Sequence, residues 1–264
     1  MKQKNVLRKL LDEGKPTFGM RVLSIWPGLV EVIGHSGVID YVEFQGDYAP
    51  YDLHTLENFG RAVDLFDDMS AMMKIEQQPR TFLAIRAIGS GIQNLIFADI
   101  RTPEDAAEVV ASSRAETPET GGIAGVGMRR DVGYVVHPGS PEYVESLEQG
   151  IVALTIEKRS AIERLEEVLS VKGVDMVQFG KADYSMSIGS PGEWESAKVK
   201  DAESQMIQTA LRMGITPRVE IQKFEQAQYY MDMGVKDFCL GTDVEVIFDY
   251  CRDQVEKLAN LLGR

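Results

Sequence analysis

The alternation of hydrophobic and polar stretches along the chain predicts eight short buried strands with helices between them. Most of the strand candidates are rich in Val, Ile, Phe, Met or Tyr, as strands of a parallel sheet covered on both faces should be. The seventh candidate, PRVEI, has the weakest pattern. The eight predicted strands are Thr17–Leu23, Tyr41–Gln45, Ala71–Glu76, Asn94–Ile100, Val152–Glu157, Met176–Gly180, Pro217–Ile221 and Asp237–Gly241.

The segments between these strands are typical of amphipathic helices. In Leu53–Met69, apolar residues from Leu56 to Phe66 recur at three- and four-residue spacing, which predicts one apolar helix face. The sequence TPED at Thr102 supplies an N-cap, a proline at the first helical position and two acids on the helix dipole. Glycines that fit left-handed helix ends precede four of the strands: Gly37, Gly173, Gly214 and Gly234.

Regular alternation of strands and helices predicts a parallel sheet with right-handed crossovers. Eight such units fit a single (β/α)₈ barrel, a TIM barrel, over residues 1–264. The alternative is a doubly wound open sheet, which usually carries a glycine-rich fingerprint after its first strand. Here that strand continues into SIWPG. The longest irregular stretch, Glu116–Gln149, is interpreted as a functional loop or lid.

Composition narrows the class of protein. The chain has 264 residues, 44% of them hydrophobic, and a net charge of −13, which argues against nonspecific binding to nucleic acid or to an anionic membrane. Two cysteines, Cys239 and Cys251, suggest reduced thiols rather than a disulfide framework. We see neither the apolar core of a signal peptide nor a stretch of roughly 20 apolar residues, so we expect a cytoplasmic protein.

Acidic residues stand where two neighbouring strands end. Glu157 directly follows the apolar run IVALTI, and Asp183 lies three residues after VQFG. In a barrel, the carboxyl ends of the strands form the active site, so these carboxylates can share a Mg²⁺ or Mn²⁺ ion. The alternative is that each acid caps the following helix or pairs with Lys158, Arg159 or Lys181.

The stretch LTIEKRSAIERLEEVLSVKGVDMVQFGKADYSMSIG resembles the Q-I-E-T…G-V-D…I-G-P-A-D-L-S…G segment of HpcH/HpaI-type class II pyruvate aldolases. These are the 4-hydroxy-2-oxoheptanedioate aldolases of the phosphoenolpyruvate/pyruvate barrel superfamily. DYVEFQGDYAPYDLHTL and LGTDVEVIF are similar to other segments of that family, so the resemblance covers nearly the whole chain.

The resemblance implies that Glu157 and Asp183 are the metal ligands. It also implies that the metal binds the carboxylate and keto oxygens of pyruvate and stabilises its enolate. Backbone amides from Gly180 through Ala182 to Asp183 would hold the substrate carboxylate. Thr155 stands where the family has a glutamine that contacts the substrate.

Three departures from the family concern catalysis. The proton-transferring His of the family falls at Tyr48, and the Asp that orients it falls near Ala87. The family's strand-3 arginine falls at Lys74, which keeps the charge but loses the bidentate fork. Arg86 is a rival match, although that alignment needs an insertion and deletes a helix.

We therefore expect a divalent-metal-dependent carbon–carbon lyase that reversibly cleaves a 4-hydroxy-2-oxo acid into pyruvate and an aldehyde. Lys74 would stabilise the enolate oxygen, and Tyr48 or a metal-bound water would move the proton. Two alternatives remain open: a metal-dependent 2-oxo acid decarboxylase or related lyase, and a barrel that binds an oxo acid without turnover. The resemblance also implies a homo-oligomer, possibly a hexamer, with the helix at about 244–262 exchanged between subunits or covering its own barrel.

Overall fold

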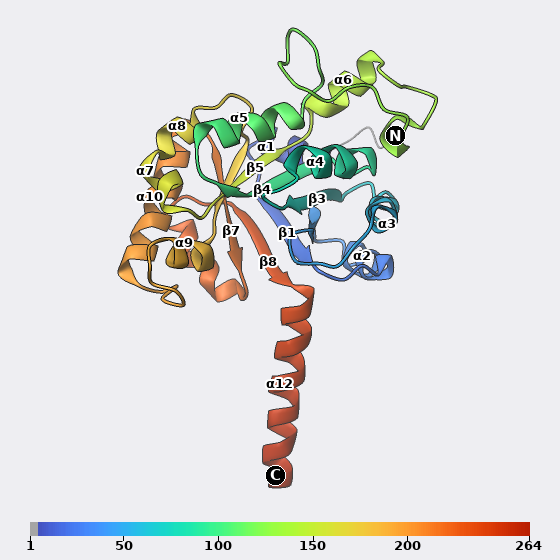
Figure 1. Ribbon diagram of the computed structural model, residues 1–264. Coiled ribbons are helices and arrows are strands. Elements are labelled where there is room, and N and C mark those ends of the chain that lie inside the picture. The colour runs from blue at the N-terminus through green and yellow to red at the C-terminus, as the bar shows by residue number, and fades with distance from the viewer. Residues whose placement is uncertain (1–4) are drawn as a thin grey trace.

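The computed structural model describes residues 5–264 as a closed barrel of eight parallel strands that follow one another in chain order (Figure 1). This closed order confirms the (β/α)₈ barrel and excludes the open doubly wound sheet. Predicted and observed strand boundaries agree to within one residue, and two strands match at both ends. The strands are β1 Thr17–Val22, β2 Tyr41–Gln45, β3 Ser70–Ile75, β4 Asn94–Ile100, β5 Val152–Ile156, β6 Met176–Phe179, β7 Thr216–Ile221 and β8 Asp237–Thr242.

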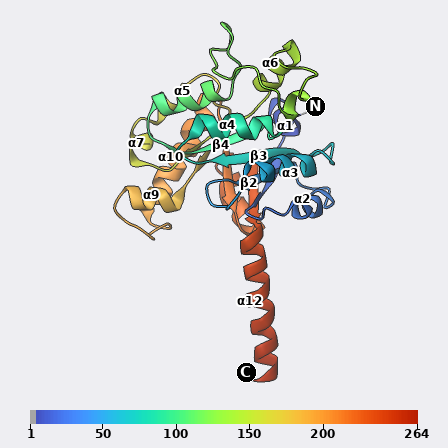
Figure 2. The same ribbon diagram turned by 45° about the vertical axis from the view of Figure 1, so that its right-hand side comes forward.

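Most of the helices lie against the outside of the barrel (Figure 2). The helices of the structure are α1 Val6–Asp12, α2 Pro27–Gly34, α3 Leu53–Val63, α4 Arg80–Gly89, α5 Pro103–Ser112, α6 Pro141–Glu148, α7 Arg159–Glu163, α8 Leu165–Leu169, α9 Lys181–Ser187, α10 Ala197–Met213, α11 Ala227–Met231 and α12 Asp243–Leu262, with short 3₁₀ turns η1 Arg130–Val132 and η2 Phe224–Gln226.

Local sequence explains where several helices begin and end. The Thr102 side chain caps α5 with Pro103 in its first turn, as predicted. Gly214 ends α10 in a left-handed conformation, with φ of 76°. The predicted helix Leu53–Met69 was too long, because α3 stops at Val63. The sequence DLFDD that follows puts three aspartates at the end of the helix, where the negative end of the dipole disfavours them.

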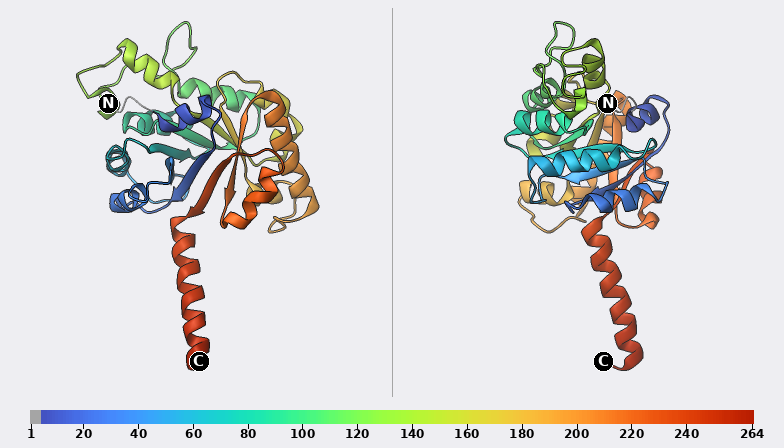
Figure 3. Two further views of the ribbon diagram at one scale, coloured as in Figure 1. Left: turned by 180° about the vertical axis from the view of Figure 1, so that it is seen from behind. Right: turned by 90° about the vertical axis from the view of Figure 1, so that its right-hand side faces the viewer.

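The stretch Glu116–Gln149 is not a lid over the carboxyl ends of the strands. It joins α5 to β5, so it lies at the amino end of the barrel, on the side opposite to α12 (Figure 3). It is also less irregular than expected. Ser140 caps α6 and Pro141 occupies its first turn, a start signal that the glycines of this stretch obscured.

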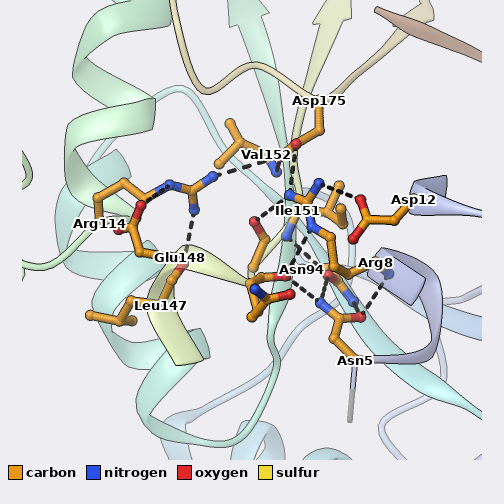
Figure 4. Close-up of polar contacts among 12 residues, drawn as sticks. Asn5, Arg8, Asp12, Asn94, Arg114, Leu147, Glu148, Ile151, Val152 and Asp175 are labelled. Atoms are coloured by element: carbon orange, nitrogen blue, oxygen red, sulfur yellow. Dashed lines mark hydrogen bonds and ion pairs between the residues drawn. The ribbon is translucent and has the colours of Figure 1, made fainter. Parts of the chain in front are cut away.

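Polar side chains close the amino end of the barrel (Figure 4). Arg8 donates to Asp175 at 2.7 Å and to the Gly150 carbonyl at 3.3 Å. The Asn5 amide donates to Asn94 at 2.6 Å. These contacts tie α1 to β4 and to the loops before β5 and β6.

An ion pair crosses the barrel interior between Glu43 on β2 and Arg218 on β7, and both side chains are fully buried. Burial alone would raise the pKa of Glu43, but the positive charges around it, Arg218 first among them, together outweigh burial and lower the pKa. Gln45 donates to Glu43, and Gln178 donates to Glu220. The middle of the barrel is therefore polar and depends on charges that neutralise each other.

Helix α12 projects away from the barrel in every view (Figures 1 to 3). Of its residues only Asp243 is buried, and Asp243 accepts hydrogen bonds from the amides of Leu23 and Ser24 at 3.0 and 2.8 Å. Apolar side chains along the helix, from Val244 to Leu262, are exposed. Within residues 5–264, α12 included, no helix combines the length and hydropathy that a bilayer crossing requires. Both Cys239 and Cys251 are free thiols, as expected.

Candidate active site

A cavity of about 410 Å³ opens at the carboxyl ends of β2 to β5 and beside the first turn of α9. This is the end of the barrel where parallel strands present variable loops around one point. Both predicted metal ligands and both predicted catalytic residues line it. The charged and aromatic side chains of its wall are Asp47, Tyr48, Lys74, Glu76, Asp99, Glu157 and Asp183.

Glu157 directly follows β5 and is 4% exposed. Its Oε1 accepts a hydrogen bond from the Asp99 amide at 2.7 Å. A Cβ atom at residue 180 would lie 2.4 Å from Glu157 Oε2, so only glycine leaves room for the carboxylate. Burial raises the pKa of Glu157 to about 6, although Lys74 and the Asp99 amide act in the opposite direction. No lysine or arginine nitrogen of residues 5–264 lies within ion-pair distance of this carboxylate.

Asp99 adopts a positive φ of 58°, a backbone conformation that residues other than glycine rarely take. The pairing of β4 with β5 shifts register between Phe97 and Ile100, so Asp99 lies in the interruption. This irregularity turns the Asp99 amide toward Glu157. Backbone strain of this kind costs about 1–3 kcal/mol and concentrates at functional sites.

Lys158 bridges two carboxylates at the edge of the cavity. Its ammonium lies 2.7 Å from Asp99 Oδ1 and 2.8 Å from Asp183 Oδ1, and the residue is 9% exposed. Pairing of Asp183 with Lys158 was one of the alternatives drawn from the sequence, and the structure contains it. Asp183 nonetheless lines the cavity together with Glu157, and its charge contributes to the raised pKa of Glu157.

Lys74 points from β3 into the cavity and is 6% exposed. Its ammonium lies 2.8 Å from Asp47 and donates to the Tyr48 hydroxyl at 3.3 Å. Burial would lower the pKa of Lys74, but Asp47, Tyr48 and Glu157 together outweigh burial and raise it, so this lysine is a fixed cation. The rival residue Arg86 belongs to α4 and packs over Phe82, away from the strand ends.

Tyr48 is 59% exposed, and partial desolvation raises the pKa of its phenol. It therefore stays protonated at neutral pH and acts as a proton donor rather than a base. Asp47 directly precedes Tyr48 in the sequence and was not among the predicted site residues. Burial raises the pKa of Asp47, opposed by Lys74.

Three of the predicted substrate-binding residues lie near the cavity but are not part of its wall. Thr155 lies two residues before Glu157 on the same face of β5, is 1% exposed, and its hydroxyl has no hydrogen-bond partner among the described residues. Gly180 abuts Glu157, and Ala182 is exposed in the first turn of α9. None of these three lines the cavity.

The carboxylate donor set fits a hard, oxygen-binding ion such as Mg²⁺ or Mn²⁺ better than Zn²⁺ or Cu²⁺, which favour nitrogen and sulfur ligands. Residues 5–264 contain no group of three or more His, Cys, Asp or Glu side chains placed to hold a metal. Two carboxylates with water at the remaining positions nevertheless suit Mg²⁺ or Mn²⁺, which keep several waters. Glu157, a desolvated carboxylate with no ammonium partner in the described chain, is the feature that favours a cation here.

Sequence reasoning gave no site role to Asp47 or Asp99, and it named Lys158 only as an alternative partner of the predicted ligands. Asp99 ends a predicted strand and Lys158 adjoins a predicted ligand, so position alone marked both as candidates. The sequence left open whether Lys158 turns toward Asp183, because that contact depends on how β4, β5 and α9 are arranged.

The chain is similar to known proteins in both sequence and fold. The family model described as HpcH/HpaI aldolase/citrate lyase matches residues 27–249. A 4-hydroxy-2-oxovalerate aldolase from Rhodococcus jostii is 28% identical over 92% of both chains. A hydroxypyruvate/pyruvate aldolase from Delftia acidovorans is 25% identical over 92% of this chain and 88% of its own. A solved HpcH/HpaI aldolase/citrate lyase family structure from Burkholderia cenocepacia superposes with a TM-score of 0.88 at 23% identity, over 97% of this chain and 99% of the other.

Proposed function

The chain belongs to the HpcH/HpaI aldolase/citrate lyase family, and from this premise we propose that it is a metal-dependent lyase acting through a pyruvate enolate. The net reaction is the reversible cleavage of a 4-hydroxy-2-oxo acid into pyruvate and an aldehyde. The observation that carries the proposal is the meeting of Glu157, Asp183 and Lys74 in one cavity. We place the enzyme in the cytoplasm, in keeping with its two free thiols.

Glu157 and Asp183 would hold the cation. Mg²⁺ or Mn²⁺ would supply Lewis acidity that stabilises negative charge on the enolate oxygen. The chain itself contributes Gly180, whose missing side chain leaves space for the Glu157 carboxylate. It also contributes the Asp99 amide, which holds Glu157 Oε1 in place.

Lys74 provides a permanent positive charge on the β3 side of the cavity. Asp47 fixes the position of its ammonium, so the charge is oriented before the substrate arrives. Tyr48 lies within hydrogen-bond distance of the same ammonium and can donate a proton to a carbanion or alkoxide. The phenol can donate this proton in the protonated form that it has at neutral pH.

Decarboxylation of a 2-oxo diacid is the second candidate function, and the raised pKa of Tyr48 favours it. Loss of carbon dioxide generates an enolate without any base, and the enolate then takes up a proton. A protonated phenol held by Lys74 suits that second step. Aldol cleavage, in contrast, requires a base for the substrate hydroxyl.

A paired assay separates the two reactions. The native chain is incubated with Mn²⁺ and either pyruvate plus an aldehyde or oxaloacetate, with a protein-free control for spontaneous decarboxylation. Aldehyde-dependent carbon–carbon bond formation that disappears in Glu157→Gln and survives in Glu163→Gln supports the aldolase. Glu163 is an exposed residue of α7 paired with Arg159, so it controls for loss of one acid.

Decarboxylation without aldol product would replace the first proposal by the second. Stabilisation by oxalate and Mn²⁺ with no turnover of either substrate would indicate an oxo-acid-binding barrel. In Tyr48→His, a gain of aldolase activity would show that residue 48 occupies the position of the base.

We also propose that α12 packs against another copy of the chain. Exposure of so many apolar side chains to water is unfavourable, and an exposed apolar surface of this kind marks a protein–protein contact. Light scattering of the full chain should give a mass well above 29.4 kDa, and a monomer would contradict the proposal. A chain ending after Asp243 should lose that association.

A further inference from the structure

Lys158 has an unusual position for a residue next to a proposed metal ligand. It immediately follows Glu157 and turns its ammonium to Asp99 Oδ1 and Asp183 Oδ1, at 2.7 and 2.8 Å. Its side chain is 11% exposed, so water screens these contacts only partly. A permanent cation therefore already occupies one oxygen of a carboxylate that lines the cavity.

We propose that Lys158 is a tethered counter-ion that competes with the divalent cation for Asp183 and so sets the metal affinity of the site. This inference rests on the proposed function, because it takes Glu157 and Asp183 as the ligands. A divalent ion that binds Asp183 must displace the ammonium from Oδ1 or share the carboxylate with it. Either event costs free energy that a site without Lys158 would not lose.

Asp99 makes the competition reversible. Once Asp183 turns to a metal ion, the Lys158 ammonium keeps its contact with Asp99 and stays at the edge of the site. The register shift between β4 and β5 places Asp99 for this role, and its amide serves Glu157 at the same time. Thus one residue anchors both the competing cation and the carboxylate that has no lysine or arginine partner among residues 5–264.

The alternative is that Lys158 only fastens β4, β5 and α9 together. The two roles predict opposite results. If Lys158 competes with the metal, its removal strengthens metal binding. If it only fastens the elements, its removal loosens Asp183 and weakens metal binding or leaves it unchanged.

The test is Mn²⁺ binding to the metal-stripped full chain, without substrate, by isothermal titration calorimetry. We expect Lys158→Met to bind Mn²⁺ about tenfold more tightly than the native chain, which corresponds to about 1.4 kcal/mol. Lys158→Arg, which keeps the charge, should stay within about threefold of the native affinity. The matched control is Arg101→Met, since Arg101 pairs with Asp99 at 3.2 Å but has no contact with Asp183.

Equal or weaker binding by Lys158→Met, with a native circular dichroism spectrum, overturns the inference. An equal gain in Arg101→Met also overturns it, because any cation near Asp99 would then have the same effect. Should Lys158→Met fail to fold, Lys158→Gln carries the same prediction in a polar side chain. Failure of the proposed function looks different: neither the native chain nor any variant would bind Mn²⁺.

Discussion

Glu157→Gln should stabilise the metal-free protein at neutral pH while it abolishes metal binding. Burial raises the pKa of Glu157 to about 6, so the folded chain holds its proton more tightly than the unfolded chain does. Glutamine has nearly the same shape, and its carbonyl oxygen can still accept the hydrogen bond from the Asp99 amide. The substitution therefore removes the cost of burying a charge and leaves the packing intact.

The magnitude follows from the two pKa values. The gap between a pKa of about 6 in the folded chain and the usual glutamate value of 4.5 corresponds to about 2 kcal/mol. For an acid whose folded pKa is raised, its contribution to stability is fully present below the unfolded pKa and is lost as pH rises through the folded one. The native chain should thus lose about 2 kcal/mol relative to Glu157→Gln between about pH 4.5 and pH 7.

Urea unfolding in the presence of a chelator, followed by circular dichroism at several pH values, measures this difference. Glu163→Gln on exposed α7 is the control and should change the free energy of unfolding by less than about 0.5 kcal/mol at each pH. A Glu157→Gln variant that is less stable than the native chain at pH 7, or whose advantage does not grow with pH, would refute the reasoning.

Three further substitutions test other contacts. Gly180→Ala places a methyl group 2.4 Å from Glu157 Oε2, so calorimetry should show Mn²⁺ binding weakened more than tenfold, and unchanged affinity would contradict the close approach. Arg218→Met leaves Glu43 buried and unpaired, so the free energy of unfolding measured in urea should fall by about 3–5 kcal/mol, and adding Glu43→Gln should partly restore it. A loss below about 1 kcal/mol would show that water reaches the pair. Lys74→Met should lower kcat by about 10²-fold and Lys74→Arg much less, whereas equal losses would mean that charge is not what Lys74 supplies.

The barrel could be predicted because its signal is repeated eight times. Each buried strand has its own apolar run, and an error at one boundary, such as the predicted start at Pro217 instead of the observed Thr216, does not alter the order of elements. The irregular stretch Glu116–Gln149 was interpreted as a functional loop or lid because of its length and glycine content, and it is not a lid over the carboxyl ends of the strands. Because the stretch follows a helix and precedes a strand, its place in the chain indicates that it lies at the amino end of the barrel.

The site could be predicted only in part. Glu157 and Asp183 follow from their positions after two neighbouring strands and Lys74 from the family resemblance, and the structure brings all three to one cavity. The backbone of Asp99 could not be predicted, because it depends on a register shift that no residue type indicates, and the pairing of Lys158 with Asp183 was left open as one of several alternatives.

The interactions that fasten the amino end of the barrel share no residue with the cavity at the carboxyl end. Substitutions at sites so far apart usually add without coupling. Mutations among the loops around the cavity can therefore accumulate without loosening the opposite end. A barrel arranged in this way can exchange one substrate, or even one reaction, for another over evolutionary time while its fold persists.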